Sequence, residues 1–135
     1  MQNGVATSIT RIGGVTTPPL NPGSGFREPF DAALSSDGAT LYISDTYQSR
    51  IAALDTASGS FVHLAGSDEE EVEHADGVGT DARFGRPSGI AITSDDQFLF
   101  VVDKQFNVIR RIEISTKTAT TFVGNFDDSS HDERG

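Results

Sequence analysis

The chain has 135 residues, a formal net charge of −10 and no cysteine. The negative charge disfavours a polyanionic partner, so we expect no nucleic acid as a partner, and the absence of cysteine excludes disulfides, thiolate nucleophiles and sulfur-ligated zinc. No run of residues approaches the roughly 18 apolar residues of a membrane span, so we expect no membrane partner, and nothing in the sequence indicates a compartment.

The first predicted element is a strand over residues 5–13, which ends on Gly13. A strand that ends on a glycine returns at residues 60–66 and 118–124. We therefore interpret residues 1–25 as the fourth strand of a preceding unit followed by a linker.

Residues 26–67 contain four short extended segments, at 31–35, 41–45, 50–55 and 60–66, with turn residues between them. The first has small side chains, typical of an innermost strand. The second is aromatic and β-branched, as in a strand buried on both faces, and the fourth alternates like an edge strand. Asp37 is expected to hold the first hairpin turn by accepting hydrogen bonds from nearby backbone N–H groups.

Residues 68–83 form an acidic, glycine-containing connection. Residues 67–81 carry seven carboxylates and no lysine or arginine. One interpretation is a docking surface for a basic protein segment or a weak cation site; the other is a solvated insertion whose like charges keep it extended. The spacing in residues 76–81 does not fit an EF-hand, so we expect its glycines to shape the turn, with Ala82 and Phe84 packed between two units.

Residues 84–125 repeat residues 26–67 without a gap at an offset of 58. The shared residues include Phe26/Phe84, Pro29/Pro87, Asp45/Asp103, Ile51/Ile109 and Gly66/Gly124. Repeats of this size stack because one unit cannot bury its own apolar faces. The pattern predicts an all-β fold of four-stranded antiparallel sheets, the blades of a β-propeller, with residues 126–135 as the start of the next inter-blade loop.

The second copy also carries a motif. It reads DGVGTDARFGRPSGIAI over residues 76–92, then LFVVD at 99–103, NVIR at 107–110 and TFVG at 121–124. This motif resembles the NHL repeat of six-bladed, TolB-like β-propellers; the first copy departs from it at Asp31, Ser49 and Ala52. The resemblance covers roughly residues 5–135 and implies about two blades of an incomplete propeller.

Two blades leave two apolar faces without a neighbour. We therefore expect neighbouring blades of the same or another chain as partners, and an isolated chain that is oligomeric, poorly soluble or partly unfolded. Ring closure by three copies is the alternative.

In propellers generally, the loops from strand four to the next strand one and from strand two to strand three share one rim, where partners usually dock. The candidate interaction residues on this rim are Tyr47, Arg50, Lys104, Phe106, Glu69, Glu70 and Glu71. Tyr47 and Phe106 are either exposed aromatic anchors or packed inward. Asp45 and Asp103 recur once per copy, which favours loop caps over catalytic carboxylates. Arg50 beside Asp45, and Arg110 and Arg111 beside Glu113, are expected to form rim or surface ion pairs of small energetic value; the alternative is substrate clamps.

Two classes of function remain. The favoured one is a non-catalytic protein-interaction scaffold with no cofactor, no metal and no catalytic residue, because the sequence contains no nucleophile elbow, phosphate loop or metal-ligand spacing. The alternative is part of a propeller enzyme, a metal-dependent lyase or a lactone or ester hydrolase, whose active site lies mostly in blades outside this chain. The inner strands of this chain offer only Asp31 to such a site.

Overall fold

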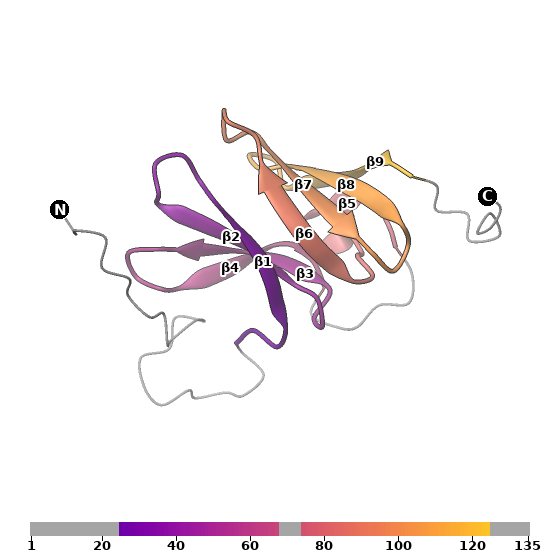
Figure 1. Cartoon of the computed structure of the whole chain (residues 1–135), viewed down its shortest axis with the longest axis horizontal. Coiled ribbons are helices and arrows are strands. Elements are labelled where there is room, and N and C mark those ends of the chain that lie inside the picture. Colours follow the sequence, from indigo (N-terminus) through magenta and orange to yellow (C-terminus); the bar gives the residue numbers. More distant parts are fainter. Residues whose placement is uncertain (1–24, 68–73, 125–135) are drawn as a thin grey trace.

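The computed structural model describes residues 25–67 and 74–124, and these residues are nearly all β (Figure 1). The first sheet, blade 1, is antiparallel with the order β1-β2-β3-β4. Its strands are β1 (Pro29–Leu34), β2 (Thr40–Asp45), β3 (Arg50–Asp55) and β4 (Phe61–Gly66).

Blade 2 repeats this meander and has the order β5-β9-β8-β7-β6. Its four long strands are β6 (Pro87–Ile92), β7 (Phe98–Asp103), β8 (Val108–Glu113) and β9 (Thr118–Val123). The inner strands β1 and β6 lie side by side at the centre of the molecule (Figure 1). The predicted all-β fold of propeller blades is confirmed.

The two blades share their turn geometry as well as their strands. Residues with a positive φ fall at the same four places in each blade, namely Gly38/Asp96, Ser49/Asn107, Gly59/Lys117 and Gly66/Gly124. The offset is 58 in each case. A left-handed backbone favours glycine, so the equivalent positions show that the local chain path, and not only the strand order, is repeated.

An aspartate holds the first hairpin turn of each blade, as predicted. The Asp37 carboxylate accepts hydrogen bonds from the Ala39 N–H at 2.9 Å and from the Ser35 hydroxyl at 2.7 Å. In blade 2, Asp95 accepts them from the Gln97 N–H at 3.1 Å and the Thr93 hydroxyl at 2.7 Å.

The core lies between the two blades. Ala82 and Phe84 are fully buried there, as the sequence predicts, together with apolar side chains of both sheets. Blade 1 contributes Tyr42, Ile51, Leu64 and Ala65, and blade 2 contributes Ile90, Leu99, Val101, Ile112 and Ala119.

Polar side chains of blade 1 also bind the backbone of blade 2. The hydroxyls of Ser44, Thr46 and Ser49 donate to the carbonyls of Ser88, Pro87 and Gly85, at 2.6, 2.6 and 3.0 Å. Asp31 accepts a 3.0 Å hydrogen bond from the Ile90 N–H. The departure from the NHL pattern at Asp31 thus supplies a contact between blades.

In the described part of the connection expected over residues 68–83, which is residues 74–83, the structure has two short elements. Strand β5 (Gly77–Val78) pairs with β9, and the 3₁₀ helix η1 (Gly79–Asp81) follows it. The N–H of Gly79, whose φ is +57°, donates to the Lys117 carbonyl at 2.8 Å. This segment is ordered into a strand because the edge of β9 offers backbone groups to pair with. The predictions for residues 5–13, 69–71 and 126–135 lie outside the described residues.

Candidate interaction rim

Buried carboxylates shape the rim of the molecule at the ends of β2 and β7. Asp45 and Asp103 are both completely buried. Asp45 accepts 2.9 Å hydrogen bonds from the N–H groups of Arg27 and Glu28, and Asp103 accepts from those of Gly85 and Arg86 at 2.7 and 3.0 Å. The interpretation of these residues as loop caps is confirmed.

The caps bring two kinds of loop to the same edge. The main chain after β2 is hydrogen-bonded to the loop before β1, because the Thr46 N–H donates to the Glu28 carbonyl at 2.9 Å. The same bond recurs in blade 2 from Lys104 to Arg86, at 3.2 Å. Loops preceding strand one and following strand two therefore share one rim.

Aromatic and cationic side chains occupy this rim in pairs. Tyr47 is 43 % exposed, and the Arg27 guanidinium lies 4.5 Å from its ring centroid. Phe30 is 54 % exposed, and the ammonium of Lys104 lies 4.6 Å from its ring centroid. The second pair spans the two blades, since Phe30 belongs to β1 and Lys104 follows β7.

An exposed ion pair joins these two pairs into one patch. The Arg86 guanidinium lies 3.9 Å from the Glu28 carboxylate, across the blade boundary. We call the surface of Arg27, Phe30, Tyr47, Arg86 and Lys104 the cationic rim. The sequence predicted Tyr47 and Lys104 as interaction residues. It missed the other three, although each lies within four residues of a Phe-x-x-Pro segment that could have marked the loop before strand one.

Arg50 and Arg110 both form ion pairs, Arg110 with Asp76 instead of Glu113, but the expectation that these pairs lie at the surface is wrong, because the two side chains are 1 % and 0 % exposed. Arg50 does pair with Asp45, at 3.5 Å, but inside the fold, where its guanidinium also donates to the Gly25 carbonyl and lies over the rings of Phe26 and Phe61. A buried Arg50 contacts blade residues and presents no surface to a partner.

The side chain of Arg110 likewise makes its contacts inside the fold. It donates to the carbonyls of Arg83 and Ala75 at 2.8 and 2.7 Å, pairs with Asp76 at 3.0 Å, and lies over the ring of Phe84. Burial lowers the pKa of Arg110 from its ordinary value, and the neighbouring carboxylates of Asp76 and Asp103 oppose that shift. Arg110 therefore anchors the segment that precedes Phe84 to blade 2.

Phe106 is packed inward, which is one of the two alternatives for it. Its half-buried ring meets the His74 ring edge-on at 4.7 Å, and a Cβ on Gly85 would lie 2.5 Å from it. The remaining candidates, Glu69, Glu70 and Glu71, lie outside the described residues.

The opposite rim, formed by the turns after β1, β3, β6 and β8, is acidic. Its carboxylates are Asp37, Asp55, Asp95, Asp96 and Glu113. Hydrogen bonds from the Ala39 N–H and the Ser35 hydroxyl lower the pKa of Asp37, and those from the Thr93 hydroxyl and the Gln97 N–H lower that of Asp95. These five carboxylates contrast with the three cations of the cationic rim, although the connection before β6 also carries the exposed Asp76 and Asp81.

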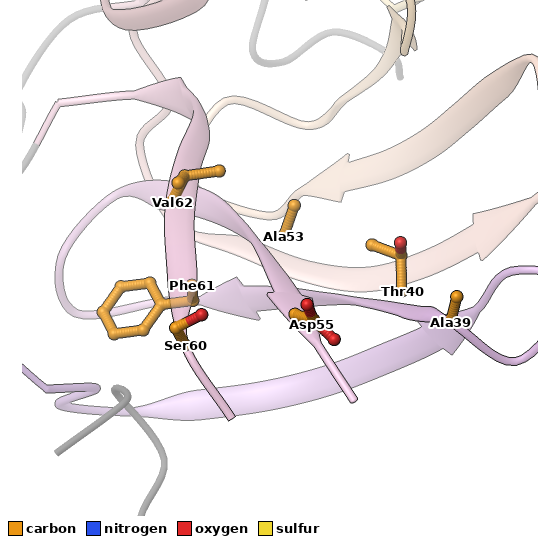
Figure 2. A pocket seen from close by; sticks show the side chains of 7 residues that line it. All are labelled: Ala39, Thr40, Ala53, Asp55, Ser60, Phe61 and Val62. Atoms are coloured by element: carbon orange, nitrogen blue, oxygen red, sulfur yellow. The ribbon is translucent and has the colours of Figure 1, made fainter. Parts of the chain in front are cut away.

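The described residues hold no cluster of three or more histidine or acidic side chains that could bind a metal ion. An open depression of about 430 Å³ lies over the start of β2, the end of β3 and the start of β4 (Figure 2). Its one carboxylate, Asp55, accepts a hydrogen bond from the Ala57 N–H at 2.9 Å and so belongs to a turn. In those same residues, no helix is long and apolar enough to cross a membrane.

The repeated four-stranded sheets define the class of this chain as β-propeller blades. No family model matches it. It is 30 % identical over 107 residues to Protein SUPPRESSOR OF QUENCHING 1, chloroplastic, of Arabidopsis thaliana. This alignment covers 75 % of this chain and 10 % of that protein. It is 29 % identical over 82 residues to NHL repeat-containing protein 2 of Bos taurus, covering 61 % of this chain and 11 % of that protein. The chain therefore spans about a tenth of the length of these relatives.

Solved structures agree on the fold. An auxiliary nutrient binding protein from Bacteroides thetaiotaomicron superposes with a TM-score of 0.62 at 23 % identity, over 75 % of this chain and 26 % of that one. Hydrazine synthase from Kuenenia stuttgartiensis gives 0.54 at 24 % identity, over 74 % and 24 % of the two chains. At this identity the likeness concerns architecture alone.

Proposed function

We propose that these blades belong to an NHL-type β-propeller that acts as a non-catalytic protein-interaction scaffold. The similarity to NHL repeat-containing protein 2 supports the NHL assignment, and a six-bladed ring is part of the proposal. The observation that carries the scaffold role is the cationic rim, where two exposed aromatic side chains are held in place by loops that buried aspartates cap. Exposed aromatic side chains on a rigid frame are typical anchors of protein interfaces.

The enzyme alternative requires inward-facing metal ligands. Of the two described inner strands, β1 contributes one carboxylate, Asp31, and β6 contributes none. Both carboxylate oxygens of Asp31 accept backbone hydrogen bonds, from Ala32 and Ile90. That environment favours a structural role for Asp31 over metal ligation.

Photo-crosslinking tests the scaffold role. The full-length protein is expressed in its own cells with p-benzoylphenylalanine at Tyr47, and a matched variant carries it at the exposed Ala57 on the acidic rim. We expect one discrete protein adduct from position 47 and none from position 57. Equal adducts at both positions would contradict a docking rim.

Metal analysis of the purified full-length protein separates the two classes of function. A scaffold is expected to hold no tightly bound ion. One divalent ion per chain that survives dialysis would favour the metal-dependent enzyme instead.

A further inference from the structure

We infer that the cationic rim binds an acidic peptide segment in which carboxylates alternate with apolar side chains. This inference rests on the proposed scaffold function and names the chemistry of its partner at this surface. It differs from the basic partner that the acidic residues 67–81 suggest.

The first argument is unneutralised charge. Among the described residues, no carboxylate lies within ion-pair distance of Arg27 or Lys104, whereas Arg86 pairs with Glu28. Both unpaired side chains are exposed. Arg111 and Lys117 also have no carboxylate partner among these residues, but Arg27 and Lys104 lie on one rim, where both can bind carboxylates of a single segment.

The second argument is the placement of these cations over aromatic rings. Arg27 lies over Tyr47 and Lys104 lies over Phe30, at 4.5 and 4.6 Å from the ring centroids. A cation over a ring is oriented by the ring quadrupole and loses less side-chain entropy when it binds an anion. Phe30 and Tyr47 keep about half of their surface exposed, so an apolar side chain next to each carboxylate has a ring to contact.

The third argument is the contrast between the two rims. Five carboxylates, among them Asp95 and Asp96, lie on the opposite rim, whereas the five residues of the cationic rim include three cations and no carboxylate, with Glu28 as the ion-pair partner of Arg86. Complementary fields orient a charged partner and exclude the wrong one. An acidic peptide is thus attracted to the cationic rim and repelled from the opposite one.

RNA fits this surface less well than a peptide. Three cations neutralise few phosphates, and affinity for nucleic acid depends on the number neutralised. The net charge of −10 repels a long polyanion, whereas a short peptide contacts only the cationic rim.

Fluorescence anisotropy tests the inference on the full chain. The probe is a fluorescein-labelled peptide of alternating Glu and Leu; the comparison probes are the same peptide with Lys for every Glu, and an oligouridine of equal length. We expect the Glu–Leu peptide to bind at least about tenfold more tightly than either, with an affinity that falls as NaCl rises from about 50 to about 300 mM.

The variants locate the site. Arg27→Gln combined with Lys104→Gln should weaken binding of the Glu–Leu peptide by about tenfold. Lys117→Gln removes one exposed cation from the opposite rim and should leave binding within about twofold. Circular dichroism confirms that the variants fold, and the salt dependence of the unaltered protein tests the inference if they do not.

Three outcomes would overturn the inference: equal binding of the Glu–Leu and Lys–Leu peptides, tighter binding of the oligouridine, or equal effects of the rim and Lys117 variants. Crosslinking at Tyr47 distinguishes these failures from failure of the scaffold role. A discrete adduct there without preference for the acidic peptide would retain the scaffold and remove this partner.

Discussion

Single buried polar residues do most of the positioning in this molecule. Asp45 and Asp103 are completely buried, and each accepts two hydrogen bonds from the N–H groups of the loop before its inner strand. Asp103 also accepts one from the Gln105 N–H, at 3.2 Å. Hydrogen bonds to a buried charged acceptor stabilise more than neutral ones, so these carboxylates hold the rim that carries the candidate partner residues.

Replacing one capping carboxylate tests how much it contributes to the free energy of unfolding. Asp103→Asn replaces a carboxylate with an amide that has one acceptor oxygen and turns a donor toward N–H groups. We expect the free energy of unfolding to fall by about 2 to 4 kcal/mol. Urea unfolding followed by circular dichroism measures it, and Asp81→Asn, at an exposed position of η1, is the control expected within about 0.5 kcal/mol. Equal effects of the two variants would contradict the cap.

The buried arginines show that residue type alone does not predict whether a charged side chain is exposed. Charged residues are rarely fully buried, and a single pair of arginines within a strand reads as a surface feature. Arg110 is buried because the carbonyls of Ala75 and Arg83 converge on its guanidinium. Those carbonyls are brought there by the path of the connecting segment, which the residue itself does not encode.

At the scale of elements, the turns repeat more faithfully than their residues do. Gly59 and Lys117 occupy the same turn with φ of +82° and +62°. A lysine in the left-handed region costs more conformational energy than a glycine, while glycine costs more entropy on folding.

Lys117→Gly should therefore stabilise the chain, by about 0.5 to 1 kcal/mol. The hydrogen bond from the residue 117 N–H to the Glu113 carbonyl, 2.7 Å long, is kept. Thermal unfolding measures the change, and Gly59→Lys, the reverse change in blade 1, should lower stability. A fall in stability for both variants would show that the two turns are not equivalent.

The aspartate of each hairpin turn predicts a pH dependence. The Thr93 hydroxyl and the Gln97 N–H lower the pKa of Asp95 below its ordinary value of 3.8. Because the folded pKa is lowered, the stabilisation is fully present above about pH 4 and is lost as the pH falls through the folded pKa. Asp95→Asn should lower the unfolding midpoint near pH 7, and its difference from the unaltered chain should shrink in more acid solution.

Urea unfolding between about pH 7 and pH 2.5 checks this dependence. Thr93→Val is the matched control: it removes the hydroxyl donor that lowers the pKa most, so the pH dependence of the Asp95→Asn effect should be smaller in that background. A difference that grows as the pH falls would have the wrong sign for a lowered pKa.

At the scale of the whole molecule, the two blades are not interchangeable. The face of blade 1 that meets blade 2 carries Tyr42 and Ser44, whereas the same positions of blade 2 carry Phe100 and Val102. Phe100 meets Phe122 edge-on at 4.9 Å on this second face. Val102 and Phe122 are 41 % and 56 % exposed there. An apolar face of this kind contributes on the order of 25 cal/mol per Å² when another surface covers it.

Self-association through this face is therefore expected. Phe122→Glu should shift the chain toward monomer in sedimentation velocity, because a carboxylate on the face opposes its burial. Val62→Glu, at an exposed position of β4 in blade 1, is the control and should leave the distribution unchanged. A sharp monomer of the unaltered chain in light scattering would contradict the prediction.

The sequence by itself determined those features that a local pattern of residues encodes. The 58-residue repeat, the strand order within each blade, the turn aspartates and the capping role of Asp45 and Asp103 all follow from short-range spacing. Such spacing acts through neighbouring backbone groups.

The tertiary structure decided what depends on surfaces that meet from distant parts of the chain. The strand β5, the burial of Arg50 and Arg110, and the cationic rim arise where loops of two blades converge. Arg27 and Phe30 are ordinary surface residues in sequence, and of these three residues only Lys104 was predicted to belong to an interaction rim. They become one patch because stacking of the blades brings β1 beside β6 and sets the ammonium of Lys104 over the ring of Phe30.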